Sequence, residues 1–178
     1  MEPTDSERQI RRLDVGDLAA LQALRREALV RHPLAFLVCV EEDLLLDPVL
    51  GREALTNAKV SAVFGGFVGV RLVGMVGVHR QERRKIQHRA VIWGMYVTAA
   101  ARRTGIGRAL LAAAVEHART WSGVIQVELS VSEAAIAARR LYESAGFQCW
   151  GQEPRALHWE QRFADEYHLA MQLDGEPR

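Results

Sequence analysis

The segment with the clearest potential for chemistry carries two glycines directly after two arginines and a threonine. It lies between a strand-like stretch at residues 90–97 and a helical pattern at about 105–121, and it reads Arg102-Arg103-Thr104-Gly105-Ile106-Gly107. The first N–H groups of a helix lack intrahelical partners, and the helix dipole places partial positive charge beside them. Glycine lets a ligand approach the backbone closely, so this junction predicts a site for a phosphate-type anion.

The glycine pair alone is a weak signal, because an ordinary loop with a flexible helix start has the same composition. No Gly-Lys-Ser/Thr follows it and the third glycine of a dinucleotide fingerprint is missing, so neither of those motifs is present. A second element is Tyr142, which shares one face of a predicted helix at 133–145 with Ala138 and Ala135. The alanines indicate that something other than a bulky core lies against this face. A tight helix–sheet contact with Tyr142 at its rim is the alternative.

The elements that must position these residues follow from hydrophobic spacing. A short strand is expected at 9–13, followed by a helix that Asp14 or Asp17 could cap and that ends at His32-Pro33. The charged positions 25–27 of this helix are expected to point mostly outward. Further helical stretches are expected near 41–46 and 52–59. Strands at 60–68, 72–79 and 90–97, with a turn at 69–71, predict an antiparallel meander.

The second half of the chain alternates strand and helix. A helix at about 105–121 precedes a strand at 124–131, and the helix at 133–145 is stopped by Gly146. Closing strands are expected at 147–151 and 167–173. Because strand–helix–strand units are normally right-handed and parallel, the sheet should be mixed. We therefore predict an α+β (α/β-like) fold with a mixed, mostly antiparallel sheet of six to seven strands. One domain spans 1–178, with its core at about 9–173 and short flexible termini.

Composition narrows the functional classes. The chain has 178 residues, 49% of them apolar, which suffices for one core without disulfides or a structural metal. A formal charge of +1 indicates no nucleic-acid or acidic-membrane partner. Cys39 and Cys149 follow no metal or redox spacing and are expected to be reduced thiols. The charged first residues do not resemble a signal peptide, and no apolar run reaches membrane-spanning length. We expect a cytoplasmic protein without a metal.

Several motifs together resemble the GNAT superfamily of N-acetyltransferases. They are Arg102-x-x-Gly105-x-Gly107, Leu129-x-Val131, Ala138, and Leu141-Tyr142-Glu143-x-x-Gly146-Phe147. The resemblance is most specific over 91–147 and extends more loosely over 10–171. It implies the GNAT fold, acetyl-CoA as cosubstrate, and a cleft along the third meander strand for the pantetheine. It assigns acetyl-CoA binding to Met95, Tyr96, Val97, Arg102, Arg103, Thr104, Gly105, Ile106, Gly107, Arg108, Ala135, Ala138 and Tyr142.

The resemblance also implies a mechanism and shows two departures. Tyr142 matches the general acid that protonates the leaving thiolate. Ala135 stands where the family often has an asparagine, and Gly94 where it often has a glutamate base. Glu128 and His88 are therefore candidate bases. Glu128 could instead pair with an arginine, His88 could be a surface residue, and water could remove the proton.

The expected acceptor is a primary amine of a small molecule, a peptide N-terminus or a lysine, attacked directly in a ternary complex because neither cysteine has an activating partner. Trp93, Phe36 and Trp159 could line the acceptor pocket or belong to the core. The resemblance suggests a homodimer. A non-catalytic acyl-CoA-binding module is the alternative function. The sequence does not distinguish acetyl from other acyl groups.

Overall fold

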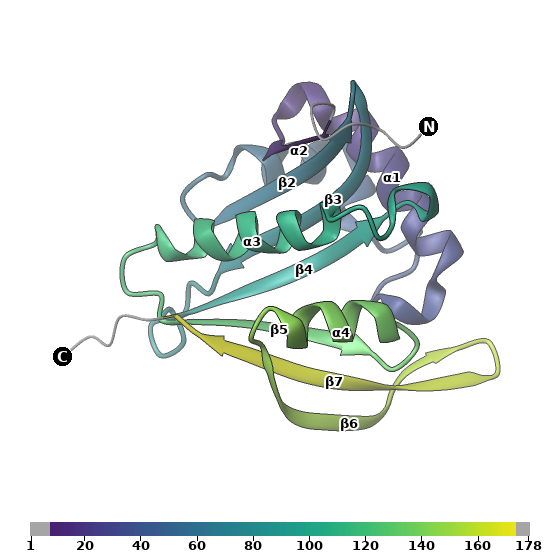
Figure 1. Ribbon diagram of the computed structural model, residues 1–178, viewed down its shortest axis with the longest axis vertical. Helices are drawn as coiled ribbons and strands as arrows, with labels where there is room; N and C mark the ends of the chain where they lie inside the picture. Colours follow the sequence, from purple (N-terminus) through teal and green to yellow (C-terminus); the bar gives the residue numbers. More distant parts are fainter. Residues whose placement is uncertain (1–7, 174–178) are drawn as a thin grey trace.

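The protein, described here as a computed structural model, is built on one mixed sheet with helices on both faces (Figure 1). The structure describes residues 8–173. The predicted short termini at 1–7 and 174–178 lie outside this range. Its strands are β1 (Arg8–Arg12), β2 (Ser61–Val68), β3 (Arg71–Arg80), β4 (Arg89–Val97), β5 (Gln126–Ser132), β6 (Gln148–Trp159) and β7 (Arg162–Gln172). Its α-helices are α1 (Leu18–Arg31), α2 (Pro48–Thr56), α3 (Ile106–Arg119) and α4 (Ile136–Ser144). Four short 3₁₀ helices are η2 (Val15–Asp17), η3 (Pro33–Ala35), η4 (Leu44–Leu46) and η5 (Ala99–Ala101).

The sheet order is β1-β2-β3-β4-β5-β7-β6. β4 and β5 are parallel, and each other neighbouring pair is antiparallel. This arrangement confirms the α+β GNAT-type fold and the mixed, mostly antiparallel sheet. One parallel pair arises because β4 and β5 are joined through α3, whereas hairpins or short loops join most of the other neighbours.

Two separate cores cover the two faces of the sheet. α3 and α4 pack on one face, where Leu110, Ala114 and Tyr142 lie among buried residues of β3 to β5. α1 packs on the opposite face through Leu21 and Leu24, next to α2. Figure 1 shows the same division, with α3 and α4 in front of the sheet and α1 and α2 behind it. β4 contributes to both cores, with Ala90 and Ile92 in that of α3 and α4 and Tyr96 in that of α1 and α2.

Local signals explain where the helices begin and end. Asp14 and Asp17 form a capping box at η2, which leads directly into α1. Asp47 accepts hydrogen bonds from the N–H groups of Val49 and Leu50, and Pro48 occupies the first position of α2. The chain leaves α4 through Gly146 at φ +101°, as the glycine stop predicted.

Two expectations about the elements are wrong. Arg25 does not point outward: it is 5% exposed and lies on the buried side of α1. The closing strands are also much longer than predicted, because 148–159 and 162–172 form one long hairpin. Register irregularities between Glu153 and Leu157, with left-handed backbone at Arg155, interrupt the alternation that would have marked β6 as a strand.

Two further observations bear on the chemical environment. Within residues 8–173, no helix has the length and apolarity to cross a membrane. Cys39 and Cys149 are free thiols, as their spacing predicted.

Candidate active site

The predicted anion loop connects β4 to α3 and is shaped by left-handed backbone. Arg103 has φ +61° and Gly105 has φ +89°. Gly105 is the N-cap of α3, and a β-carbon placed there would find no atom within 4 Å. The backbone at this point is therefore open to an approaching ligand. The first N–H groups of α3 follow directly, and they have no intrahelical partner and no side-chain cap.

Side chains from the loop hold it in place. The Arg102 Nε donates to the carbonyl of Val97 at 3.1 Å, and its Nη2 lies 3.0 Å from His32 Nε2. The Thr104 hydroxyl donates to the carbonyl of Ala101 at 2.7 Å, and Arg8 Nη1 donates to the carbonyl of Thr104 at 2.8 Å. Arg102 thus links the loop to His32 at the end of α1, while the backbone N–H groups of the loop can contact an anion.

A cavity of about 1110 Å³ lies beside the loop. Five arginines line it, against one acidic side chain, Glu27; they are Arg8, Arg31, Arg71, Arg102 and Arg103. Only two of these positions, 102 and 103, belong to the motif that the sequence singled out. The others come from β1, α1 and β3, so their gathering depends on the tertiary fold. The combined charge favours phosphate-bearing ligands next to the loop.

β4 and β5 diverge beside this loop. They pair at Arg89–Gln126, Ala90–Val127 and Val91–Glu128, and the pairing ends there. Figure 1 shows the two strands separating toward the ends that lead to α3 and α4. Gly94 has φ +64°, and the register between β3 and β4 shifts at this point, which marks a bulge in β4. The β5-facing edge at Met95, Tyr96 and Val97 is consequently unpaired in the described sheet.

Tyr142 stands across the divergence on α4. It is 5% exposed, and its ring lies 6.1 Å from that of Phe147 in an edge-on arrangement. Burial raises the pKa of its phenol well above the ordinary value. A phenol in this environment keeps its proton at neutral pH. Ala135 and Ala138 pack against the same core, so the small-residue stripe brings α4 close to the sheet.

The two candidate bases lie near the closed end of the divergence. Glu128 Oε1 accepts from Arg89 Nη1 at 2.9 Å and from Gln126 Nε2 at 2.6 Å. The sequence left open whether Glu128 pairs with an arginine, and in the structure it pairs with Arg89. His88 precedes β4, and its carbonyl accepts from the N–H groups of Ile125 and Gln126. Neither residue comes together with the Gly94 bulge or Tyr142.

A buried ion pair beside the bulge was missed by sequence reasoning. Arg25 Nε and Nη2 contact Asp43 Oδ2 at 2.8 and 2.7 Å, and its guanidinium lies 4.7 Å from the Phe36 ring. A β-carbon placed on Gly94 would lie 3.7 Å from Arg25 Nη1. Charged residues on a helix are normally read as solvent-facing, so no signal within α1 could have placed Arg25 here.

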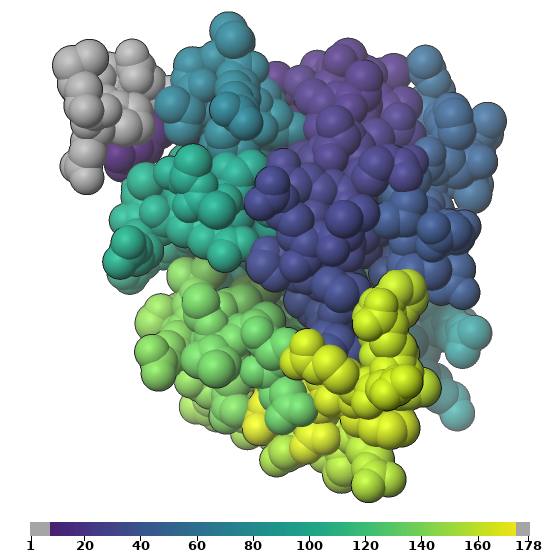
Figure 2. Space-filling view, turned by 90° about the vertical axis from the view of Figure 1, so that its right-hand side faces the viewer, coloured from purple at the N-terminus to yellow at the C-terminus, as the bar shows by residue number. Residues whose placement is uncertain are grey.

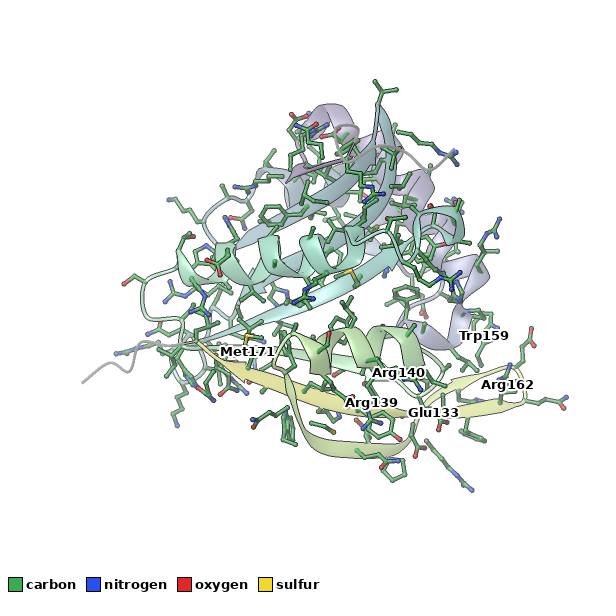
Figure 3. The ribbon with its side chains drawn as sticks, viewed as in Figure 1. Glu133, Arg139, Arg140, Trp159, Arg162 and Met171 are labelled. Carbon is green, nitrogen blue, oxygen red and sulfur yellow. The ribbon has the colours of Figure 1, made fainter. Side chains whose placement is uncertain are left out.

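A second cavity, of about 720 Å³, lies between the end of α1, the segment 33–42 and β6. Apolar side chains that include Phe36 and Trp159 line it together with polar groups, and Glu41, Glu42 and Glu160 provide acidic groups. Trp93 does not line it and packs tightly over Gly77 instead. Figure 3 shows Trp159 at the end of β6, beside the segment that follows α1. Figure 2 looks onto the face where this segment, the β4–α3 loop, α4 and the β6–β7 hairpin meet.

Comparison with known proteins agrees with this arrangement. A solved structure named yncA from Salmonella typhimurium, described with its cofactor acetyl-CoA, is 22% identical, with 97% of each chain covered and a TM-score of 0.82. Spermidine N-acetyltransferase from Vibrio cholerae, in complex with CoA and spermine, is 19% identical over 94% of this chain and 96% of that chain, with a TM-score of 0.75.

A sequence relative matches more closely over a short region. A 49-residue segment is 55% identical to mycothiol acetyltransferase from Thermobispora bispora, and it spans 28% of this chain and 16% of that relative. The model of the acetyltransferase (GNAT) family matches residues 19–147, a range that contains both the glycine loop and Tyr142. Because this match covers well over half of the chain and the fold agrees, the protein belongs to the acetyltransferase (GNAT) family.

Proposed function

We propose that the protein transfers an acetyl group from acetyl-CoA to a primary amine in a ternary complex. The observation that carries the proposal is the divergence of β4 from β5, with the open Gly105 loop at one end and the buried Tyr142 across it. Acetyl-CoA supplies the acetyl group as a thioester. The remaining chemistry falls to groups of the protein.

The residues around the divergence fit this cosubstrate. The loop from Arg102 to Arg108 offers open backbone and arginine charge to phosphates, and the unpaired edge at Met95, Tyr96 and Val97 offers hydrogen-bonding groups to the pantetheine amides. Ala135 and Ala138 leave room along α4. A backbone N–H near Met95 would stabilise the oxyanion that develops during transfer.

Proton transfers complete the reaction. A primary amine has a pKa of about 10.4 and must lose a proton before it attacks. Tyr142 lies across the divergence from the unpaired edge of β4 and carries a phenol proton at neutral pH, so it is our candidate acid for the departing sulfur. Glu128 and His88 stay candidate bases, although Glu128 is already engaged by Arg89 and Gln126.

The acceptor is proposed to approach through the 720 Å³ cavity. Its apolar side chains fit the carbon skeleton of an amine, and its acidic groups favour a cation over an anion. Small-molecule amines and peptide N-termini both meet this description.

A homodimer remains a prediction, which light scattering of the purified protein tests.

The variant Tyr142→Phe tests the assignment of the acid. We expect turnover with an amine acceptor to fall by about 10²- to 10⁴-fold, because the phenol proton is lost, while acetyl-CoA affinity is retained. Tyr167→Phe is the matched control, since Tyr167 lies on β7 under Arg139. Equal turnover in both variants would show that Tyr142 is not the acid. Weakened acetyl-CoA binding in Tyr142→Phe alone would assign it to cofactor binding.

A further inference from the structure

Glu166 is a buried carboxylate that the mechanism above does not use. It lies on β7 and is 8% exposed. Among the described residues, no side chain is hydrogen-bonded to it, yet its oxygens are not among the fully buried side-chain atoms that lack a partner. Glu166 is therefore a largely buried carboxylate whose oxygens can still be reached. A cationic ligand would be attracted to such a group.

Glu166 lies between the acceptor cavity and the diverging strands. Ala164, two residues earlier on the same face of β7, packs with Leu34 and Leu157, and both of these leucines line the cavity. On its other side Glu166 pairs with Ser132 at the end of β5. η3 contacts β5 and β6, the two strands that flank β7.

Counted along the strands from the last β4–β5 pair, Glu166 and the bulge are at similar heights, and Glu166 lies two strands from β4 in the sheet order. Val91 pairs with Glu128, and Gly94 lies three residues beyond Val91 in β4. Ser132 lies four residues beyond Glu128 in the parallel strand β5, so Ser132 and its partner Glu166 are at about the level of Gly94. His88, by contrast, is about 20 Å from Gly94 along β4 and Glu128 is at a level about 10 Å away.

Neighbouring groups offer a route for a proton. One carboxylate oxygen each of Glu166 and Glu153 and one ring nitrogen of His168 lie within 4.8 Å of one another. His168 Nδ1 is 2.9 Å from Ser130 Oγ, and its Nε2 is 3.2 Å from Glu153 Oε2. The Glu153 side chain is 58% exposed, so the cluster leads from the buried Glu166 to solvent. Three strands supply these residues: β7 carries Glu166 and His168, β6 carries Glu153, and β5 carries Ser130.

We propose that Glu166 binds the ammonium group of the acceptor and removes its proton, in place of the glutamate that Gly94 replaces. The inference rests on the proposed acetyl transfer and names the base for it. The ammonium gives one proton to a Glu166 oxygen, which passes it through His168 to solvent. The nitrogen lone pair then forms the N–C bond as the C–S bond breaks, with its electron pair moving to sulfur. The nitrogen releases its second proton to Glu166, and the sulfur takes the proton of Tyr142. Glu166 then passes its proton through His168 to solvent, and the Tyr142 phenolate takes a proton from solvent, which restores both groups.

The electrostatics of Glu166 suit this role. Burial raises the pKa of the Glu166 carboxyl, His168 opposes that shift and Glu153 adds to it. Those two are the titratable groups that face it, since β5 presents Ser130 and Ser132 and η3 carries no charged side chain. A carboxylate of raised pKa is a stronger base than an ordinary glutamate.

The test compares Glu166→Gln with wild type on two acceptors of similar shape. 2-Phenylethylamine is an ammonium ion at pH 7, whereas O-benzylhydroxylamine is neutral there and needs no base before attack. If 2-phenylethylamine is not acetylated, the fastest amine of a panel and its aminooxy counterpart take their places. We expect kcat/KM to fall by about 10²- to 10⁴-fold for the ammonium acceptor and by less than about 10-fold for the neutral one.

Two controls separate chemistry from structure. Glu116→Gln changes a carboxyl that is 71% exposed on α3 and should leave both acceptors unaffected. Circular dichroism and acetyl-CoA binding should be the same for Glu166→Gln and wild type, and Glu166→Asp should restore part of the activity. Equal losses with both acceptors, or no loss with either, would overturn the role of Glu166. A wild-type protein that acetylates no amine would instead overturn the proposed function itself.

Discussion

At the scale of single residues, the Arg25–Asp43 ion pair is a buried link beside the Gly94 bulge. Both side chains are almost fully buried, and Asp43 also accepts a hydrogen bond from the N–H of Leu45. The pair ties α1 to the segment that leads into η4, and Phe36 of the acceptor cavity lies over the guanidinium. Loss of one partner would leave a charge buried without compensation, which is far more costly than loss of a surface pair.

The variant Asp43→Ala tests this view. We expect the free energy of unfolding to fall by about 3 to 5 kcal/mol, because Arg25 would stay buried without its partner. Glu116→Ala removes the exposed pair with Arg119 and should cost less than about 1 kcal/mol. Urea denaturation of both variants measures the difference. Similar small losses in the two variants would show that the buried pair is not a structural determinant.

Glu166 makes a second residue-scale prediction, on stability and pH. Its folded-state pKa is raised, so its contribution to stability is fully present below the unfolded pKa and is lost as pH rises through the folded value. Replacement by Gln, which is always neutral, should therefore raise the melting temperature at pH 8 and leave it nearly unchanged at pH 4. Thermal unfolding at the two pH values measures this. A stabilisation that is the same at both pH values would contradict the assignment of a buried, ionised carboxylate.

At the scale of elements, the β4–α3 junction depends on the left-handed glycine at position 105. Gly105→Ala should cost about 1 to 2 kcal/mol in backbone strain and should weaken acetyl-CoA binding, because the loop backbone must shift. Gly123→Ala is the matched control: Gly123 has φ +79°, and its nearest neighbour atom would be 4.0 Å away. Isothermal titration with acetyl-CoA should show weaker binding for the first variant alone. Equal affinities in the two variants would remove the loop from the cofactor site.

The sequence predicted most elements because each carries a local signal. The meander, α3, α4 and the glycine loop follow from hydrophobic spacing and turn residues, and the structure has them within a few residues of the expected bounds. The span 152–166 carries no such signal, since bulges and left-handed residues break the alternation of β6. The sequence offered Phe36 and Trp159 as pocket residues, and both line the 720 Å³ cavity, but it did not predict the long strand that carries Trp159. Arg25 and Glu166 become site residues only when segments distant in the sequence pack together.

At the scale of the whole molecule, two cavities of different character lie near the C-terminal end of α1. The arginine-lined cavity and the glycine loop lie at the junction of β4 and α3, whereas the 720 Å³ cavity lies between α1, the segment 33–42 and the β6–β7 hairpin (Figure 2). The diverging strands β4 and β5 connect the two regions. Under the proposed function, the cofactor would approach from the first cavity and the acceptor from the second.

Trp159 tests this division. It lines the acceptor cavity from the end of β6, so Trp159→Ala should raise KM for an apolar amine by about 10-fold or more, with acetyl-CoA affinity unchanged. Val70→Ala, at a fully exposed turn, serves as the control. Steady-state kinetics with each substrate varied in turn separates the two effects. A rise in KM for acetyl-CoA instead would place the cavity on the cofactor path.

The most direct test of the central claim is thiol release from acetyl-CoA by the wild-type protein, measured against a panel of amines, amino acids, aminoglycosides and short peptides. We predict amine-dependent release above the amine-free rate, with the acetylated amine identified by mass spectrometry. Absence of both acetyl-CoA binding and amine-dependent thiol release across the panel would contradict the account.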